Sequence, residues 1–271
     1  MTRVTPFEER RFRTAARHYL RGRPFYAAGL IRRLVQISGL GPGARVMDLG
    51  CGPGQLAVAL APFVGEVVAL DPEPEMLRIA AQSAADAHLD IRFLKAGSED
   101  IGPRLGESDL GRFDLVVIGR AFHWMDRPRT LQRLGPLIAA RGAVALLDTK
   151  LPKLPDNAWA ESYEALIERY SAGGGPRPRR KSADWLPHEA VLLDSAFSRI
   201  EAIEVLERRR TPLAQFIDRA LSLSSTSAAR IGHRTAELAV AIDAALAPFA
   251  TEGLITEAVA SRATLAWRPE G

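Results

Sequence analysis

One stretch of sequence decides the fold of this protein: Val46-Met47-Asp48-Leu49-Gly50-Cys51-Gly52-Pro53-Gly54-Gln55. Residues 45–49 predict a short buried strand, and residues 55–62 predict the helix that follows the glycines. Glycines permit a sharp turn and let a ligand lie against the backbone, where a Cβ atom would clash. The first turn of the helix leaves N–H groups that point at this ligand. The stretch therefore predicts a ligand over residues 50–54.

The charges around the turn indicate which ligand it is. A dinucleotide fingerprint needs a third glycine where this chain has Gln55, and Pro53 removes one amide donor from the turn. Asp48 stands just before the glycines, where its carboxylate would repel a diphosphate but suit a cation. S-adenosylmethionine carries an ammonium and a sulfonium and no phosphate. The charge pattern therefore favours S-adenosylmethionine over a dinucleotide.

A second acidic residue lies at the end of the next predicted strand, residues 66–71. Asp71 can accept both hydroxyls of an adenosine ribose, a contact that NAD-binding proteins also use. Pro72 follows, and Pro74 begins a predicted helix that carries Met76 in its first turn. This acid supports an adenosine ligand without choosing the cofactor.

Four motifs, in this order and spacing, resemble class I S-adenosylmethionine-dependent methyltransferases that act on small molecules. They are residues 46–55, 67–77, 96–100 and 113–117, and the resemblance covers residues 7–150 well and the remainder poorly. Related enzymes often carry an aspartate for the adenine amino group where this chain has Gly97, so Ser98 and Glu99 are the candidates here. The cofactor-binding residues implied are Asp48, Gly50, Cys51, Gly52, Gly54, Asp71, Pro72, Met76, Ser98, Glu99, Arg120 and Tyr19.

Strand and helix patterns alternate between residues 44 and 150. Strands are predicted at 45–49, 66–71, 90–95, 113–119 and 142–149, with helices at 55–62, 74–86 and 127–138. This order predicts parallel strands with crossover helices on both faces. The fold class expected is α/β: a Rossmann-like three-layer sandwich with a mostly parallel seven-stranded sheet, whose last strand the resemblance makes antiparallel.

The pattern changes after residue 150. Helices are predicted at 159–170, 187–194, 212–223 and 235–249, with strands at 199–205 and 260–267. The resemblance implies that these two strands close the sheet, so the helices between them form an insertion, which we interpret as a substrate cap. The expected division is an N-terminal helical lid (1–43), a cofactor-binding core (44–150) and a cap with the last two strands (151–271).

The segment after the predicted strand 113–119 is Gly119-Arg120-Ala121-Phe122-His123-Trp124, and the resemblance places it beside the transferring methyl group. His123 is the candidate base or positioning residue, because its ordinary pKa lies near neutrality. The alternative is that His123 and Trp124 only pack the turn. The expected substrate pocket consists of Arg23, Tyr26, Phe122, His123 and Trp124.

Composition limits the other classes of function. The chain has 271 residues, a net charge of +4 and a single cysteine, Cys51, which we expect to pack under the turn. The basic clusters lack interleaved aromatic residues, and the histidines lack the spacing of metal ligands, so neither nucleic acid nor a metal is expected. No apolar run reaches the ~18 residues of a membrane helix, and the first residues have no apolar signal core. We expect a cytoplasmic protein, as a monomer or homodimer.

The leading hypothesis is methyl transfer from S-adenosylmethionine to a small organic acceptor, such as a secondary metabolite, by direct displacement, with S-adenosylhomocysteine as product. The alternative is a protein that binds this cofactor without transferring methyl, since fold and cofactor motif do not fix the reaction. A nucleic-acid methyltransferase is the third hypothesis, disfavoured because residues 120–124 lack the Asn/Asp-Pro-Pro-aromatic motif.

Overall fold

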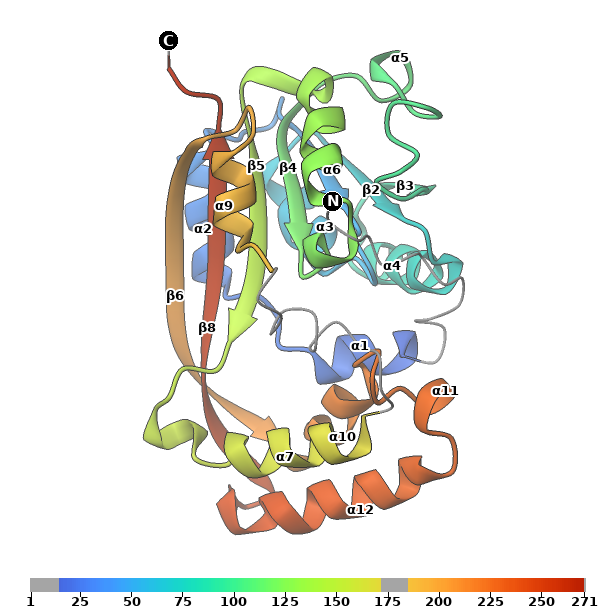
Figure 1. Cartoon of the computed structure of the whole chain (residues 1–271), viewed down its shortest axis with the longest axis vertical. Coiled ribbons are helices and arrows are strands. Elements are labelled where there is room, and N and C mark those ends of the chain that lie inside the picture. The colour runs from blue at the N-terminus through green and yellow to red at the C-terminus, as the bar shows by residue number, and fades with distance from the viewer. Residues whose placement is uncertain (1–14, 172–184, 271) are drawn as a thin grey trace.

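The computed structural model describes residues 15–171 and 185–270 (Figure 1). Its main sheet has the strand order β3-β2-β1-β4-β5-β8-β6, in which β1 to β5 are parallel and β8 runs antiparallel to both β5 and β6. The strands are β1 (Arg45–Leu49), β2 (Glu66–Asp71), β3 (Arg92–Lys95), β4 (Phe113–Gly119), β5 (Ile138–Lys150), β6 (Arg199–Pro212) and β8 (Leu254–Trp267). A two-residue strand, β7 (Ala250–Thr251), pairs with β8 outside this order. The predicted fold class is confirmed.

Helices cover both faces of the sheet, because successive side chains of each central strand point to opposite faces and nearly all are apolar. Met47 and Leu49 pack on the face that carries α5 (Glu107–Leu110), α6 (Arg127–Leu134) and α9 (His188–Leu193). Val46 packs on the opposite face, against α2 (Ala28–Ile37) and α3 (Gln55–Leu60), and α4 (Pro74–Asp86) lies on this same side. The buried strands therefore hold the carboxyl edge of the sheet in a fixed position between two helical layers.

One predicted helix is shorter than expected. Residues 127–138 were predicted as a single helix, but α6 ends at Leu134. Gly135 and Pro136 turn the chain into a short 3-10 helix, Gly135–Leu137, because glycine is a poor helix former and proline lacks the N–H that a helix needs. Strand β5 then begins at Ile138, four residues before the predicted start at 142. The other core elements lie within a few residues of their predicted bounds.

Strands β6 and β8 are each 14 residues long, so the predictions of 199–205 and 260–267 were too short. Their pairing runs unbroken from Arg199–Trp267 to Pro212–Leu254. In Figure 1 the two strands leave the core and carry a separate helical layer. Its helices are α7 (Ala160–Tyr170), α10 (Leu213–Leu221), α11 (Ala228–Ile231) and α12 (Arg234–Leu246), and they share a hydrophobic cluster of their own. The sequence signal was weak because β6 is an edge strand in which the charged residues 207–210 alternate between half-buried and exposed.

Helix α1 (Ala16–Gly22) lies between the core and this helical layer (Figure 1). Gly22 approaches α10 so closely that a Cβ atom on it would lie 2.3 Å from the backbone nitrogen of Arg219. His18 Nδ1 lies 2.6 Å from the carboxylate of Asp218, and Arg219 Nε donates to the carbonyl oxygen of Gly22 at 3.1 Å. The first part of the expected lid, residues 1–14, lies outside the described residues. The division into lid, core and cap stays a prediction.

Candidate functional site

The glycine turn follows β1 as expected, and its backbone explains the three glycines. Gly50, Gly52 and Gly54 have φ angles of 72°, 54° and 82°, a left-handed region that costs other residues energy. A Cβ atom on Gly50 would lie 2.8 Å from Cβ of Ala121, whereas a Cβ atom on Gly52 would meet nothing within 4 Å. Gly52 therefore leaves open space where a ligand can approach the backbone.

Asp71, at the tip of β2, holds the turn in place. Its Oδ2 accepts a hydrogen bond from the N–H of Gly52 at 2.8 Å, and its Oδ1 accepts one from the N–H of Glu73 at 2.9 Å. The residue is 8% exposed, and burial raises the pKa of Asp71 to about 6 against the effect of these two hydrogen bonds. Asp71 thus fixes the shape of the turn in addition to any contact with a ribose.

Asp48 is the buried acid in front of the turn. It is 1% exposed, its Oδ2 accepts a hydrogen bond from the N–H of Ala57 at 3.0 Å, and its Oδ1 has no partner among the described residues. Burial raises the pKa of Asp48 to about 7, and the nearby Asp71 adds a smaller increase. A buried carboxylate oxygen without a partner favours a cationic ligand, because the cation would offset the cost of burying the charge.

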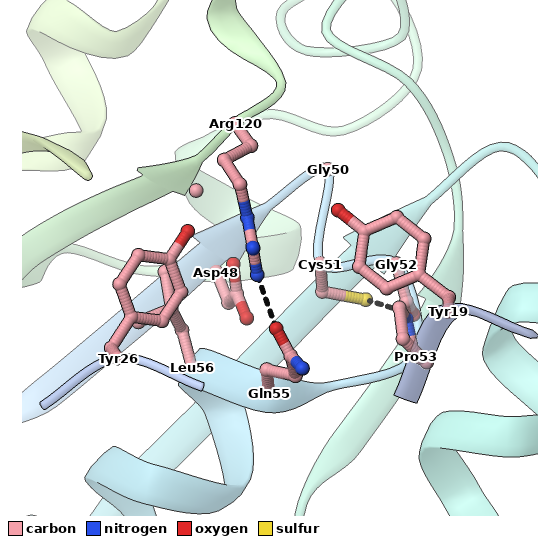
Figure 2. A pocket seen from close by; sticks show the side chains of 11 residues that line it. Tyr19, Tyr26, Asp48, Gly50, Cys51, Gly52, Pro53, Gln55, Leu56 and Arg120 are labelled. Carbon is pink, nitrogen blue, oxygen red and sulfur yellow. Dashed lines mark hydrogen bonds between the residues drawn. The ribbon is translucent and has the colours of Figure 1, made fainter. Parts of the chain in front are cut away.

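A pocket of about 270 Å³, including its open mouth, lies above the turn. Figure 2 shows the side chain of Arg120 reaching into it between Tyr26 and Tyr19, with Asp48 behind. The guanidinium carbon of Arg120 lies 4.7 Å and 5.6 Å from the ring centroids of Tyr26 and Tyr19, and one of its amino groups donates to the side-chain oxygen of Gln55. Arg120 Nε and Gln55 Nε2 are buried without partners among the described residues. The pocket thus presents an acid and a guanidinium, each with spare capacity to bind a ligand.

Seven of the predicted cofactor residues are placed at this pocket or at its turn. Those that line it are Tyr19, Asp48, Gly50, Cys51, Gly52 and Arg120, while Asp71 binds the turn from β2. Gly54 does not line the pocket: a Cβ atom on it would lie 3.0 Å from Cβ of Ala80, so it serves the close packing of α3 on α4. Burial raises the pKa of the Cys51 thiol, which keeps the thiol protonated and fits a packing role.

The remaining predicted cofactor residues lie at the ends of β2 and β3. Pro72 follows β2 directly, and Met76 is 3% exposed in the first turn of α4. Ser98 is buried, and Glu99 folds back so that a Cβ atom on Gly97 would lie 2.4 Å from a carboxylate oxygen of Glu99. The Glu99 carboxylate therefore occupies the space that a longer side chain at position 97 would take.

The residues predicted for the substrate pocket are spread over a wider region. Phe122, His123 and Trp124 form a short 3-10 helix after β4. Phe122 is 2% exposed in the main core and packs its ring 5.2 Å from that of His188 on α9, so its apolar side chain faces inward, away from the pocket. His123 and Trp124 are half-buried with ring centroids 5.1 Å apart. Of the five predicted substrate residues, only Tyr26 lines the pocket around Asp48.

Sequence reasoning missed four residues that line the pocket: Pro53, Gln55, Leu56 and Gly119. In the sequence, Gln55 stands out only because it replaces the third glycine of the dinucleotide fingerprint. Its polar side chain at the first helical position is the signal that could have indicated a pocket residue. A Cβ atom on Gly119 would lie 2.6 Å from Leu56 and 2.8 Å from the Tyr26 hydroxyl. Only the tertiary packing of β4 against α3 and Tyr26 reveals this requirement.

Two further properties concern residues 15–171 and 185–270. No group of three or more His, Cys, Asp or Glu side chains within this part of the chain has the arrangement of a metal site. None of the helices described there is both long and apolar enough to cross a membrane.

The sheet order, the glycine turn and the acids that end β1 and β2 define a class I S-adenosylmethionine-dependent methyltransferase domain. Residues 46–142 match the family described as "Methyltransferase domain".

Proteins that are similar to this chain include two curated relatives and one protein with a solved structure. A Saccharomyces cerevisiae protein named as a probable S-adenosylmethionine-dependent methyltransferase, CRG1, is 30% identical over 52% of this chain and 47% of its own length. Trans-aconitate 2-methyltransferase of Rhodococcus jostii is 36% identical over 45% of this chain and 42% of its own. The crystal structure of the [4+2]-cyclase SpnF is similar in fold, with a TM-score of 0.56 and 16% identity, covering 99% of this chain and 100% of that one. The chain spans about half the length of the curated relatives it matches.

Proposed function

We propose that this protein transfers the methyl group of S-adenosylmethionine to a small organic acceptor and releases S-adenosylhomocysteine. The observation that carries the proposal is the presence of opposite charges in one pocket, which both Asp48 and Arg120 line. The amino-acid end of the cofactor has an ammonium and a carboxylate, and its sulfonium adds a second positive charge. A dinucleotide diphosphate would instead bring two negative charges beside Asp48.

The polar atoms left unpaired in the pocket fit this cofactor. Asp48 Oδ1 would accept a hydrogen bond from the ammonium, and Arg120 Nε would donate to the carboxylate. Asp71 would bind the ribose hydroxyls, and Glu99 with the N–H of Ser98 would bind the adenine, beside Pro72 and Met76. Bound there, the cofactor supplies a methyl carbon that the sulfonium has already activated.

The acceptor must then be aligned with that methyl carbon. A lone pair of the acceptor forms the new bond while the carbon–sulfur bond breaks, and the electron pair stays on sulfur. Alignment alone can lower such a barrier by roughly 7–11 kcal/mol. His123 would orient the acceptor or remove its proton, with Trp124 beside it. The relative that is named for trans-aconitate supports a small-molecule acceptor.

The proposal also covers the binding partners of the protein, its oligomeric state and its location. Its partners are a small molecule and the cofactor, without nucleic acid, and it acts as a monomer or homodimer in the cytoplasm. The lid (1–43), core (44–150) and cap (151–271) would enclose the acceptor between them.

Isothermal calorimetry tests the cofactor. We expect S-adenosylhomocysteine to bind at least roughly a hundredfold more tightly than NAD, a difference of about 2.7 kcal/mol. Arg120→Met should weaken S-adenosylhomocysteine by tenfold or more yet leave 5′-methylthioadenosine unchanged, because the latter lacks the amino-acid end. Arg129→Met, an exposed position on α6, is the matched control. Tighter binding of NAD by the unaltered protein would overturn the proposal.

Transfer of labelled methyl from S-adenosylmethionine to a panel of small acceptors tests the reaction. Cofactor binding without any methylated product would favour the alternative, a reaction of another kind at the same site, as the name of SpnF indicates for that protein on this fold. His123→Gln should lower turnover without changing cofactor affinity. If turnover by this variant depends on pH as in the unaltered protein, His123 positions the acceptor and does not remove its proton.

A further inference from the structure

Arg23 lies where the cofactor pocket meets the helical cap. It follows α1 directly, and its backbone N–H donates to the carbonyl oxygen of Tyr19 at 2.9 Å. Its guanidinium carbon lies 5.3 Å from the centroid of the Tyr19 ring. Arg23 interacts electrostatically with Arg120 from the pocket. It also interacts with Tyr163 and Arg219 from the cap. Arg23 is therefore a cation held between the two parts of the molecule.

This cation has no acidic partner within the described part of the chain. Its Nε is buried and makes no hydrogen bond there. Burial lowers the pKa of Arg23, and the positive charges of Arg120 and Arg219 act in the same direction, whereas Tyr19 and Tyr163 act against them. Arg23 is half-buried with its Nε withdrawn from water, and such a charge is costly without a partner, so a protein normally pairs it. The surroundings of Arg23 are therefore those expected of a binding site for an anionic ligand.

The two neighbouring arginines are already accounted for. Arg219 pairs with Glu257 through two hydrogen bonds of 2.8 Å and 2.9 Å, and Thr211 binds the same carboxylate at 2.6 Å. Arg120 bonds to Gln55 inside the cofactor pocket and lies within electrostatic range of Asp148. Of these three arginines, Arg23 is the one that neither pairs with an acid among the described residues nor lines the cofactor pocket.

We infer that the acceptor carries a carboxylate that pairs with the guanidinium of Arg23, between the Tyr19 ring and the cap. The inference rests on the proposed function, because it names the acceptor of that reaction. A guanidinium matches a carboxylate with two parallel hydrogen bonds, which fixes orientation as well as position. Such pairing withdraws electron density from the bound carboxylate, so a different group of the acceptor receives the methyl. The acceptor is then an acid with a second nucleophilic group.

Calorimetry on the full chain, saturated with S-adenosylhomocysteine, tests this inference. The probes are trans-aconitate, citrate and 4-hydroxybenzoate, each beside its neutral methyl ester. We expect at least one acid to bind and its ester to bind at least roughly tenfold more weakly, since the ester cannot form the charged pair. Arg23→Met should weaken that acid by a similar factor, and Arg23→Lys should recover part of the loss.

Arg21→Met is the matched control, because Arg21 lies two residues before Arg23, in α1, with its side chain 66% exposed. Equal binding of acid and ester, no binding of any acid, or full affinity in Arg23→Met would each overturn the inference. A loss of S-adenosylhomocysteine affinity in Arg23→Met, with acid binding unchanged, would assign Arg23 to the cofactor's carboxylate and also overturn it. Failure of the unaltered protein to bind S-adenosylhomocysteine would instead reject the proposed function, together with the inference that depends on it.

Discussion

The carboxylate of Asp71 accepts a hydrogen bond from the backbone N–H of Gly52 at 2.8 Å, so the tip of one strand holds the glycine turn of its neighbour. The other oxygen of Asp71 accepts the N–H of Glu73 at 2.9 Å. The same side chain therefore links three segments: β2, the start of α4 and the turn after β1. We propose that cofactor affinity depends on this link through the shape of the turn, in addition to a direct contact with Asp71.

Replacing Asp71 by asparagine should disturb this link. An amide has only one accepting oxygen, so one of the two backbone N–H groups loses its partner, at a cost of about 1–3 kcal/mol. We expect the affinity for S-adenosylhomocysteine to fall roughly tenfold or more, measured by calorimetry. Glu66→Gln, at the other end of β2, should leave it unchanged. An Asp71→Asn variant that binds normally would contradict the assigned role.

The stability of the ligand-free protein should fall as the pH rises from about 4 to about 7. In the unfolded chain Asp48 ionises near 3.8, whereas in the folded chain burial raises its pKa to about 7. Between these values the folded state holds a proton that the unfolded state has released, so raising the pH favours unfolding. The stability lost is at most on the order of 4 kcal/mol and is complete above the folded pKa. Asp71, with its pKa raised to about 6, contributes with the same sign over a narrower range.

Urea unfolding at pH 4.5, 6 and 8 measures this effect. Asp48→Asn should flatten much of the decline and make the ligand-free protein more stable at pH 8 than the unaltered one. The exposed Asp90→Asn should change neither the slope nor the stability. A decline of equal size in Asp48→Asn would show that other groups cause it.

Substitutions at two glycines with similar backbone angles can distinguish the effect of backbone strain from the effect of ligand contact. Gly52 and Gly39 have φ angles of 54° and 62°, and a Cβ atom on either would meet nothing within 4 Å. Alanine at either position should therefore cost about 1–2 kcal/mol of stability from the left-handed backbone alone. Only Gly52→Ala should also weaken S-adenosylhomocysteine, because its methyl group would enter the pocket. Thermal unfolding and calorimetry on both variants measure the two effects, and equal cofactor affinity in the two would contradict this placement of the ligand.

The contact between Gly22 and Arg219 predicts a coupling of α1 to α10 in the helical layer. A Cβ atom on Gly22 would lie 2.3 Å from the Arg219 backbone, so Gly22→Ala must push α1 away from α10. We expect a loss of about 1–3 kcal/mol in stability and a raised KM for the acceptor. Gly29→Ala, where the nearest contact is an ordinary 3.6 Å to Val205, should be neutral or slightly stabilising. An unchanged KM in Gly22→Ala would show that the contact does not shape the acceptor site.

Most of the core could be predicted from the sequence because its signals are local. Strands β1, β2 and β4 are apolar runs ended by turn residues, and they have the predicted bounds. Only about half of the length of each long strand, β6 and β8, was predicted. In β6 the charged residues 207–210 do not form an apolar pattern that would indicate a strand. Their pairing depends on contacts between segments some 50 residues apart, which no local pattern encodes.

The sequence by itself determined the class of fold and the kind of ligand. The glycines, Asp48 and Asp71 are local features whose backbone and charge requirements can be deduced without coordinates. Only the tertiary structure decided that Arg120 reaches Gln55 between two tyrosines, that Phe122 belongs to the core, and that Arg23 has no acidic partner among the described residues. The physical reason is that the environment of a long side chain depends on which distant segments pack against it. Strand and turn propensities, in contrast, are set by neighbours in the chain.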